Sequence, residues 1–147
     1  MNFTTGKMKP DPSGRATTDR TGDTGRPLPA EYAGEGYLGL AKAARNILRN
    51  RRLRGRYLPA DLFADPAWDI LLDLFAASAE GQAVSVTSAC VAAAVPVTTA
   101  QRWLRELERQ GLVERQHDDG DRRRVLVRIS GAGRDAIAAW LTATGGT

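Results

Sequence analysis

From residue 37 to residue 54, apolar positions recur every three or four residues, which predicts an amphipathic helix. The positions that form this stripe are Tyr37, Leu40, Ala41, Ala44, Ile47 and Leu48. The pattern fades at Gly55, and Pro59 opposes continuation because it lacks the amide hydrogen that a helix interior needs. We therefore expect the first helix to end before residue 55.

A second helix is expected from Pro66 to about residue 80. Asp65 is a favourable N-cap, Pro66 suits the first helical position, and Gly81 is placed to end the helix. Its expected buried face consists of Ala67, Ile70, Leu71, Leu74 and Phe75. Asp69 and Asp73 are four residues apart, and we expect them on the surface of this helix.

The next segment contains short elements in a distinctive order. A strand is expected over residues 83–86, a short helix over 87–94, a turn at Val95 and Pro96, and a longer helix over 97–110. Gly111 is the expected C-terminal cap of the longer helix. The side chains expected to face inward from it are Ala100, Trp103, Leu104 and Leu107.

After Gly111 the apolar period changes to two, which indicates strands. Residues 112–115 and 124–129 flank a polar turn at 117–121 and therefore predict a β-hairpin. Ser130 is the expected N-cap of a last helix with Ile137, Trp140 and Leu141 on its apolar face. The predicted fold is mainly α with a small β-wing, a winged helix-turn-helix with extra N-terminal and C-terminal helices.

Residues 1–36 differ in composition from the remainder. They contain six Gly and four Pro, and few large apolar side chains. Such a segment cannot bury enough surface to offset the entropy of ordering it, so we expect a flexible tail. Residues 37–147 are then the folded unit.

The chain is basic, with a net charge of +4 and a sequence pI of about 9.7. Eighteen of its basic residues are Arg and three are Lys. The planar guanidinium matches phosphate and guanine edges, which favours a nucleic-acid partner, although GC-rich coding also enriches Arg. The run 42–56 holds seven basic residues and no acid; it can contact DNA flanks, bind RNA, or form the solvated side of a helix.

Other classes of function have little support in the sequence. One cysteine, Cys90, excludes an internal disulfide, and the single His117 leaves too few ligands for a zinc site. The expected small-residue surroundings of Cys90 favour a buried thiol over a redox sensor. The carboxylates of the region 61–73 have no nucleophile beside them, so no catalytic residue, metal or cofactor is expected. The sequence has no apolar run long enough to span a membrane and no signal peptide, which predicts a cytoplasmic protein with no membrane partner.

The helix 97–110 has the residues that a recognition helix requires. A helix in the major groove needs an apolar inner face and donor-rich outer side chains near its N-terminus. The side chains expected to contact DNA from this helix are Val97, Thr98, Thr99, Gln101, Arg102 and Arg105. Thr hydroxyls can bind phosphate, Gln pairs with adenine, and Arg binds guanine bidentately.

The hairpin supplies a second expected contact. Arg122, Arg123 and Arg124 follow an acidic tip, where a wing would reach the adjacent minor groove and its negative potential. Asp119 and Asp121 are expected to hold these guanidiniums in one orientation, which would lower the entropic cost of binding.

These motifs together resemble the winged helix of the MarR (multiple antibiotic resistance regulator) family. The run from Val97 to Val113 is similar to that family's recognition helix and first wing strand, and Asp121-Arg122-Arg123 to its wing-tip Asp-Arg element. Ile129-Ser130-Gly131-Ala132-Gly133 is similar to its Leu-Thr-x-x-Gly step, with Ile and Ser substituted. With the two preceding helices, the resemblance covers about 105 residues.

The resemblance implies a sequence-specific, repressor-type regulator of transcription that binds double-stranded DNA as a homodimer. It also implies that a small-molecule effector, of unknown identity here, or cysteine oxidation can release the DNA. Because the segment after Ser130 is short, the candidate dimerisation helices are 37–54 and 131–143. The alternative is a winged helix used for protein–protein contacts without DNA binding, since the fold alone does not determine function.

Overall fold

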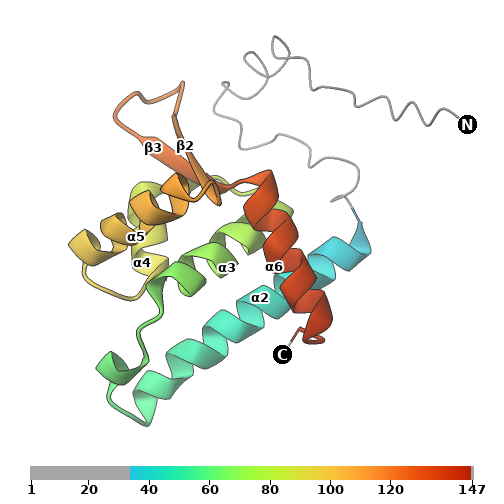
Figure 1. Cartoon of the computed structure of the whole chain (residues 1–147). Coiled ribbons are helices and arrows are strands. Elements are labelled where there is room, and N and C mark those ends of the chain that lie inside the picture. The colour runs from blue at the N-terminus through green and yellow to red at the C-terminus, as the bar shows by residue number, and fades with distance from the viewer. Residues whose placement is uncertain (1–33, 147) are drawn as a thin grey trace, which may run out of the picture.

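The elements of the chain follow one another in the order helix, helix, strand, helix, helix, hairpin, helix (Figure 1). The computed structural model describes residues 34–146; the expected flexible tail lies outside the described residues except for its last three positions. The main elements are α2 (Glu35–Leu53), α3 (Pro66–Ala79), β1 (Val84–Ser85), α4 (Val86–Ala92), α5 (Val97–Arg109), β2 (Val113–His117), β3 (Val125–Ile129) and α6 (Gly131–Ala143). Two 3₁₀ turns, η2 (Arg54–Arg56) and η3 (Ala60–Phe63), connect α2 to α3. The predicted fold class is confirmed, with α2 beginning two residues earlier than expected.

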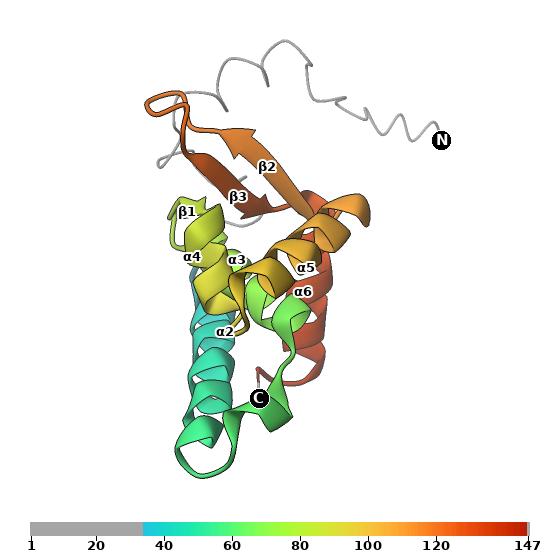
Figure 2. The same ribbon diagram turned by 90° about the vertical axis from the view of Figure 1, so that its left-hand side faces the viewer.

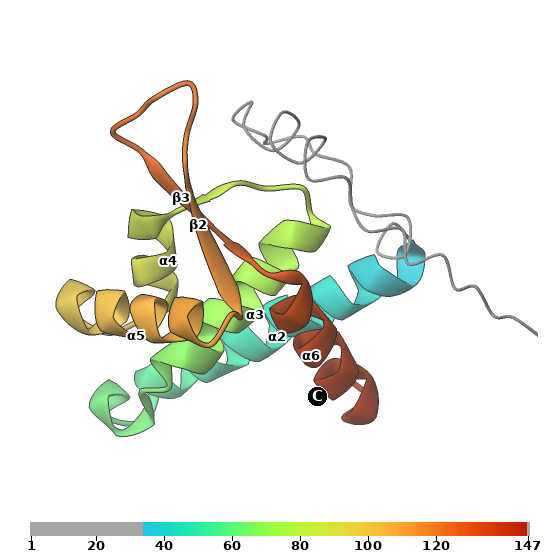
Figure 3. The ribbon, with the colours of Figure 1, turned by 45° about the horizontal axis from the view of Figure 1, so that its top comes forward.

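Helix α3 is the centre of the core, and α2 packs along it (Figure 3). Its apolar side chains are buried almost all round, and Ile70, Leu72 and Phe75 are fully inaccessible. The α2 residues that face it, Tyr37, Ala41, Ala44 and Leu48, follow the spacing that the sequence predicts. Burying side chains of this kind contributes about 1.5–3 kcal/mol for each large one, so the packing of α2 on α3 stabilises the fold substantially.

Ion pairs join α2 to α3, contrary to the expectation that the α3 carboxylates lie on the surface. Asp69 is buried, and its Oδ1 accepts from Nε of Arg51 at 2.5 Å. Asp73 is half-buried and accepts from Arg45 at 2.5 Å. Burial raises the pKa of Asp69, and the hydrogen bond from Arg51 opposes this effect. The two arginines therefore compensate carboxylates that the apolar helix would otherwise bury unpaired.

Asp65 occupies the predicted N-cap position of α3, but its side chain makes no capping hydrogen bond. Its carboxylate lies 3.8 Å from Nη2 of Arg51. The helix start is correct, whereas the chemistry assigned to this carboxylate is wrong.

Three antiparallel strands in the order β1-β3-β2 form a small sheet at one end of the molecule. Val113 pairs with Ile129 and His117 with Val125, so β2 and β3 make the predicted hairpin, while Val84 of β1 pairs with Val127. The loop 118–124 extends beyond this paired region and is the tip of the wing.

Ser130 begins α6 as predicted, since its Oγ accepts from the backbone N–H of Gly133 at 3.1 Å. A side chain at position 133 would have its Cβ 2.4 Å from the carbonyl oxygen of Leu112, which explains the glycine there. Trp140 of α6 packs edge-on against Trp68 of α3, with ring centroids 4.7 Å apart. The start of α6 therefore lies against the base of the hairpin, and Trp140 near its end packs against α3.

Candidate nucleic-acid interface

Helices α4 and α5 form the helix-turn-helix. Ser85 caps α4: its Oγ accepts from the backbone N–H of Ser88 at 3.1 Å. The turn between the helices contains Ala94 at φ 53°, a left-handed conformation that costs a residue with a Cβ about 1–2 kcal/mol. Pro96 precedes the first residue of α5 and fixes the direction of the chain as it enters that helix.

Helix α5 packs on α3 and α4 through a narrow apolar stripe. Ala100, Leu104 and Leu107 are buried, as predicted. Trp103, which was also expected inside, is 40% exposed, so that assignment is wrong. At 100° per residue, position 103 lies at the edge of the stripe formed by Ala100, Leu104 and Leu107, so its side chain is only partly covered.

The outer face of α5 has the predicted donors. Thr98, Arg102 and Arg105 are exposed, and Val97 at the start of the helix is 59% exposed. Thr99 and Gln101, on the two flanks, are half-buried. Within residues 34–146, neither Arg102 nor Arg105 forms an ion pair, so both guanidiniums are available to another molecule.

Another arginine of α5 is already neutralised. Arg109 donates through Nε and Nη2 to the carboxylate of Glu106, at 2.9 and 2.5 Å. These bonds, with one from Gln110, lower the pKa of Glu106 to about 2. The charges of Arg109 and Glu106 therefore cancel in the last turn of α5, and the arginines of this helix that remain without an ion pair among residues 34–146 are Arg102 and Arg105.

The wing tip is ordered by its own backbone and carboxylates. Asp118 Oδ1 accepts from the N–H of Gly120 at 2.9 Å, and Asp121 Oδ1 accepts from the N–H of Arg123 at 3.0 Å. The backbone N–H of Arg124 donates to the carbonyl of Asp121 at 2.9 Å, which closes the turn. Arg122, Arg123 and Arg124 are all exposed.

The role expected of Asp119 and Asp121 requires correction. Asp121 orients the backbone at Arg123, and the carboxylate nearest to a wing guanidinium is Asp118, whose Oδ2 lies 3.8 Å from Nη1 of Arg124. Asp119 is exposed. The difference arises because a carboxylate one or two residues before a turn reaches the backbone amides more readily than a distant side chain.

The wing and the helix-turn-helix enclose a groove of about 460 Å³. Its lining residues are Ser85, Val86, Thr87, Arg115, Asp121, Arg123, Arg124 and Val125. Arg115 has its Nε 3.1 Å from Oε2 of Glu108, and its Nη2 is buried without a hydrogen-bond partner among the described residues. Sequence reasoning missed this arginine; the available signal was the alternation along β2, which turns residue 115 to the same side as Val113.

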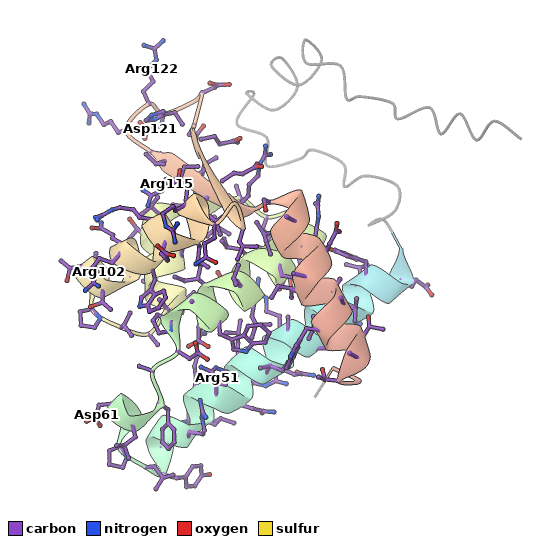
Figure 4. The ribbon with its side chains drawn as sticks, in the orientation of Figure 1. Arg51, Asp61, Arg102, Arg115, Asp121 and Arg122 are labelled. Atoms are coloured by element: carbon purple, nitrogen blue, oxygen red, sulfur yellow. The ribbon has the colours of Figure 1, made fainter. Side chains whose placement is uncertain are left out.

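The predicted contacts lie on the same side of the molecule. Figure 2 looks onto this side, with the wing at the top and α5 and α4 in the middle. Arg102 on α5 and Arg122 on the wing point away from the body, and Arg115 lies between them at the base of the wing (Figure 4). The arrangement offers a protruding helix for a groove of a duplex and, beside it, a cationic loop for the neighbouring backbone.

Cys90 lies on α4 and is buried, and this burial raises the pKa of its thiol against the weaker opposing effect of Arg115. His117 is exposed at the end of β2. Among residues 34–146 no three His, Cys, Asp or Glu side chains are grouped as a metal site requires. No helix in this part of the chain has the length and apolar character needed to cross a bilayer.

Comparisons with known proteins give a family and a set of similar structures. Residues 66–124 match the model of the MarR family. A crystal structure of a cysteine-to-serine mutant of MarR from E. coli is 18% identical, with a TM-score of 0.47, and the alignment covers 81% of this chain and 78% of that one. A second structure of MarR is 22% identical, with a TM-score of 0.45 and coverages of 76% and 74%. No curated protein matches the sequence.

A third solved structure is that of BpsR from Bordetella bronchiseptica, a protein whose DNA binding is regulated by 6-hydroxynicotinic acid. It is 22% identical, with a TM-score of 0.43, over 73% of this chain and 76% of that one.

Proposed function

We propose that this chain, whose residues 66–124 match the MarR family, is a non-enzymatic transcription regulator of the MarR type. In this proposal it binds double-stranded DNA sequence-specifically. The observation that carries the proposal is the position of uncompensated donors on one side of the molecule. Arg102 and Arg105 project from α5, and the arginines of the wing tip project beside them. A duplex presents base edges in its grooves and phosphates beside them. A winged helix would contact the base edges with its recognition helix and the phosphates with its wing.

We assign sequence reading to the outer side chains of α5 from Val97 to Arg105. In the major groove, Arg102 or Arg105 would bind guanine O6 and N7, and Gln101 would bind adenine N6 and N7. Each bidentate contact of this kind discriminates between bases by about 1–3 kcal/mol. Thr98 and Thr99 would bind the phosphate at the start of the helix, and Val97 would contact a thymine methyl group.

We assign sequence-independent affinity to the wing. Arg122 and Arg123 are exposed at the tip and would enter the adjacent minor groove, where the negative potential attracts guanidinium groups. Arg115 lines the groove between the wing and α4 and would add positive charge there.

We further propose that the protein is a homodimer, because two copies would read a pseudo-palindromic site with half-sites about one helical turn apart. Helices α2 and α6 would form the interface. They pack together, and Leu38 of α2 and Trp140 of α6 are 47% and 39% exposed although both are large and apolar.

The experiment is an anisotropy titration of the full chain against labelled duplexes over a salt series. One duplex carries DNA from beside the protein's own gene, and the other is random in sequence. We expect tighter binding of the first, with a loss of about 10³–10⁵ in affinity between 50 and 200 mM salt if 6–10 phosphates are contacted. Equal affinity for both duplexes would contradict sequence-specific regulation.

A role in protein–protein contact is the alternative, and one observation favours it. Val91, Val97 and Trp103 are exposed apolar side chains on α4 and α5, at 74%, 59% and 40%. Such side chains suit a protein partner as well as thymine methyl groups. Weak, salt-insensitive binding of both duplexes would support this alternative.

A further inference from the structure

A row of arginines follows one face of α2 toward the end of that helix. Arg45, Arg49 and Arg52 of α2 and Arg56 of the following turn η2 are separated by four, three and four residues, a spacing that keeps them on one side of the chain. They line an open groove of about 420 Å³ together with Leu48 and Leu53.

The last three of these arginines have no carboxylate partner. Arg45 is held by Asp73 and Glu80, with Nη2 3.0 Å from Oε2 of Glu80. By contrast, Arg49 donates to the amide oxygen of Asn46, and neither Arg52 nor Arg56 forms an ion pair within residues 34–146. All three are exposed. We call Arg49, Arg52 and Arg56 the α2 arginine row.

The α2 arginine row lies beside the proposed DNA-binding side of the molecule. A second groove, of about 360 Å³, is lined by Arg52 together with Ser88, Val91 and Ala92 of α4. Helix α4 is the first helix of the helix-turn-helix, which crosses the phosphate backbone in complexes of this motif. In Figure 2 the wing lies above α4 and α5, and the end of α2 with its connecting loop lies below them. The turned view in Figure 3 places the same three regions along one side.

We propose that the α2 arginine row binds phosphates of the same duplex, on the side of the recognition helix opposite the wing. This inference rests on the proposed function and adds a third contact region to it. Asp61 on η3 is an exposed carboxylate at this end of the molecule (Figure 4), and Asp65 lies 3.8 Å from Nη2 of Arg51. The three guanidiniums without a carboxylate partner outnumber Asp61, so the surface remains cationic. Since the row contacts phosphates only, it contributes affinity and salt dependence and does not read sequence.

The test compares the wild type with the triple variant Arg49→Gln, Arg52→Gln, Arg56→Gln on a preferred duplex and a random duplex. Each lost phosphate contact lowers the slope of log K against log salt by about 0.9, so we expect a decrease of about 2.7 on both duplexes. Affinity at 0.1 M salt should fall about tenfold or more, while the ratio between the two duplexes stays unchanged. Ethylation interference identifies the phosphates that each variant no longer contacts. The phosphates lost in the triple Gln variant should differ from those lost in Arg123→Ala and should lie on the other side of the DNA groove that α5 occupies.

Two further variants make the result specific. Arg49→Lys, Arg52→Lys, Arg56→Lys keeps the charge and should keep the wild-type slope; it also controls for folding. Lys42→Gln removes a charge of the same sign two turns earlier on α2 and should leave the slope unchanged.

An unchanged slope in the triple Gln variant would overturn the proposal, and so would a loss of the same phosphates as in Arg123→Ala. If the variant loses affinity for single-stranded RNA and keeps its duplex slope, the row binds RNA instead. Failure of the proposed function is a separate result, since the wild type itself would then show no preference between duplexes.

Discussion

The hydroxyl of Ser130 donates to the carbonyl oxygen of Gly111 across 2.6 Å and joins the chain just after α5 to the start of α6. The same hydroxyl oxygen accepts from the N–H of Gly133 at 3.1 Å, and the N–H of Ser130 donates to the carbonyl of Leu112 at 2.9 Å. One buried serine thus caps α6 and closes the base of the wing. It couples the position of the wing to that of α5.

Replacing Ser130 by Ala should lower the free energy of unfolding by about 1–2 kcal/mol. The change removes an N-cap, worth about 1 kcal/mol, and leaves the Gly111 carbonyl without its donor. Ser130→Thr keeps the hydroxyl and should recover most of the loss. Urea denaturation of the three proteins measures this; equal midpoints for Ala and wild type would mean that the two hydrogen bonds contribute nothing net.

Arg102 and Arg123 should respond differently to removal, because one is assigned to base edges and the other to phosphate. Arg102→Ala should cost about 1–3 kcal/mol on the preferred site and much less on random DNA. Arg123→Ala should weaken both duplexes alike and lower the salt slope by about 0.9. Anisotropy titrations with both duplexes give these values, and each variant serves as the control for the other. If Arg102→Ala left the preference for the site intact, the assignment of the outer face of α5 would be wrong.

Substitutions of Asp121 test whether an ordered wing tip is needed for DNA binding. Its carboxylate accepts from the N–H of Arg123, so Asp121→Ala should loosen the tip and weaken DNA binding severalfold. Asp121→Asn keeps an acceptor and removes a charge that phosphates repel, and it should bind at least as tightly as wild type. Dissociation constants at one salt concentration distinguish these effects. Ala binding as tightly as Asn would exclude an ordering role.

The lowered pKa of Glu106 predicts how the stability of the protein depends on pH. Its pKa falls from an ordinary 4.5 to about 2 because Arg109, and then Gln110, donate to the ionised form. A depressed folded-state pKa stabilises the protein above pH 4.5, and this contribution disappears as the pH falls toward 2. The difference in unfolding free energy between wild type and Glu106→Gln should therefore be largest above about pH 5 and smallest near about pH 2. Because the pair is exposed, added salt should also reduce it.

Urea titrations from about pH 6 to about pH 2 measure this difference directly. Glu114→Gln is a suitable control. Glu114 is an exposed carboxylate on β2, away from α5, and its Oε2 lies 3.4 Å from Nε of Arg128. A difference for Glu106→Gln that stays constant over the whole range would show that the carboxylate's ionisation is not linked to folding.

Features governed by a few neighbouring residues were predictable without a structure. Ser130 as a cap, Gly111 and Gly81 after their helices, and the hairpin at 113–129 follow from backbone requirements that act between near neighbours in the chain. The outward donors of α5 follow from the same local geometry, because its buried positions determine which side faces away. The resemblance to the MarR family rested on these local patterns, and residues 66–124 match that family.

Features that depend on packing between distant elements could not be obtained in this way. Asp69 and Asp73 look like surface residues on a helical wheel, and only the approach of α2 gives them Arg51 and Arg45 as partners. Trp103 fits an apolar period, yet it is 40% exposed. The groove at Arg115 is lined by residues of the wing and by the start of α4, which are far apart in the sequence. Local periodicity states which side of an element is apolar, whereas burial and pairing depend on what another element places against that side.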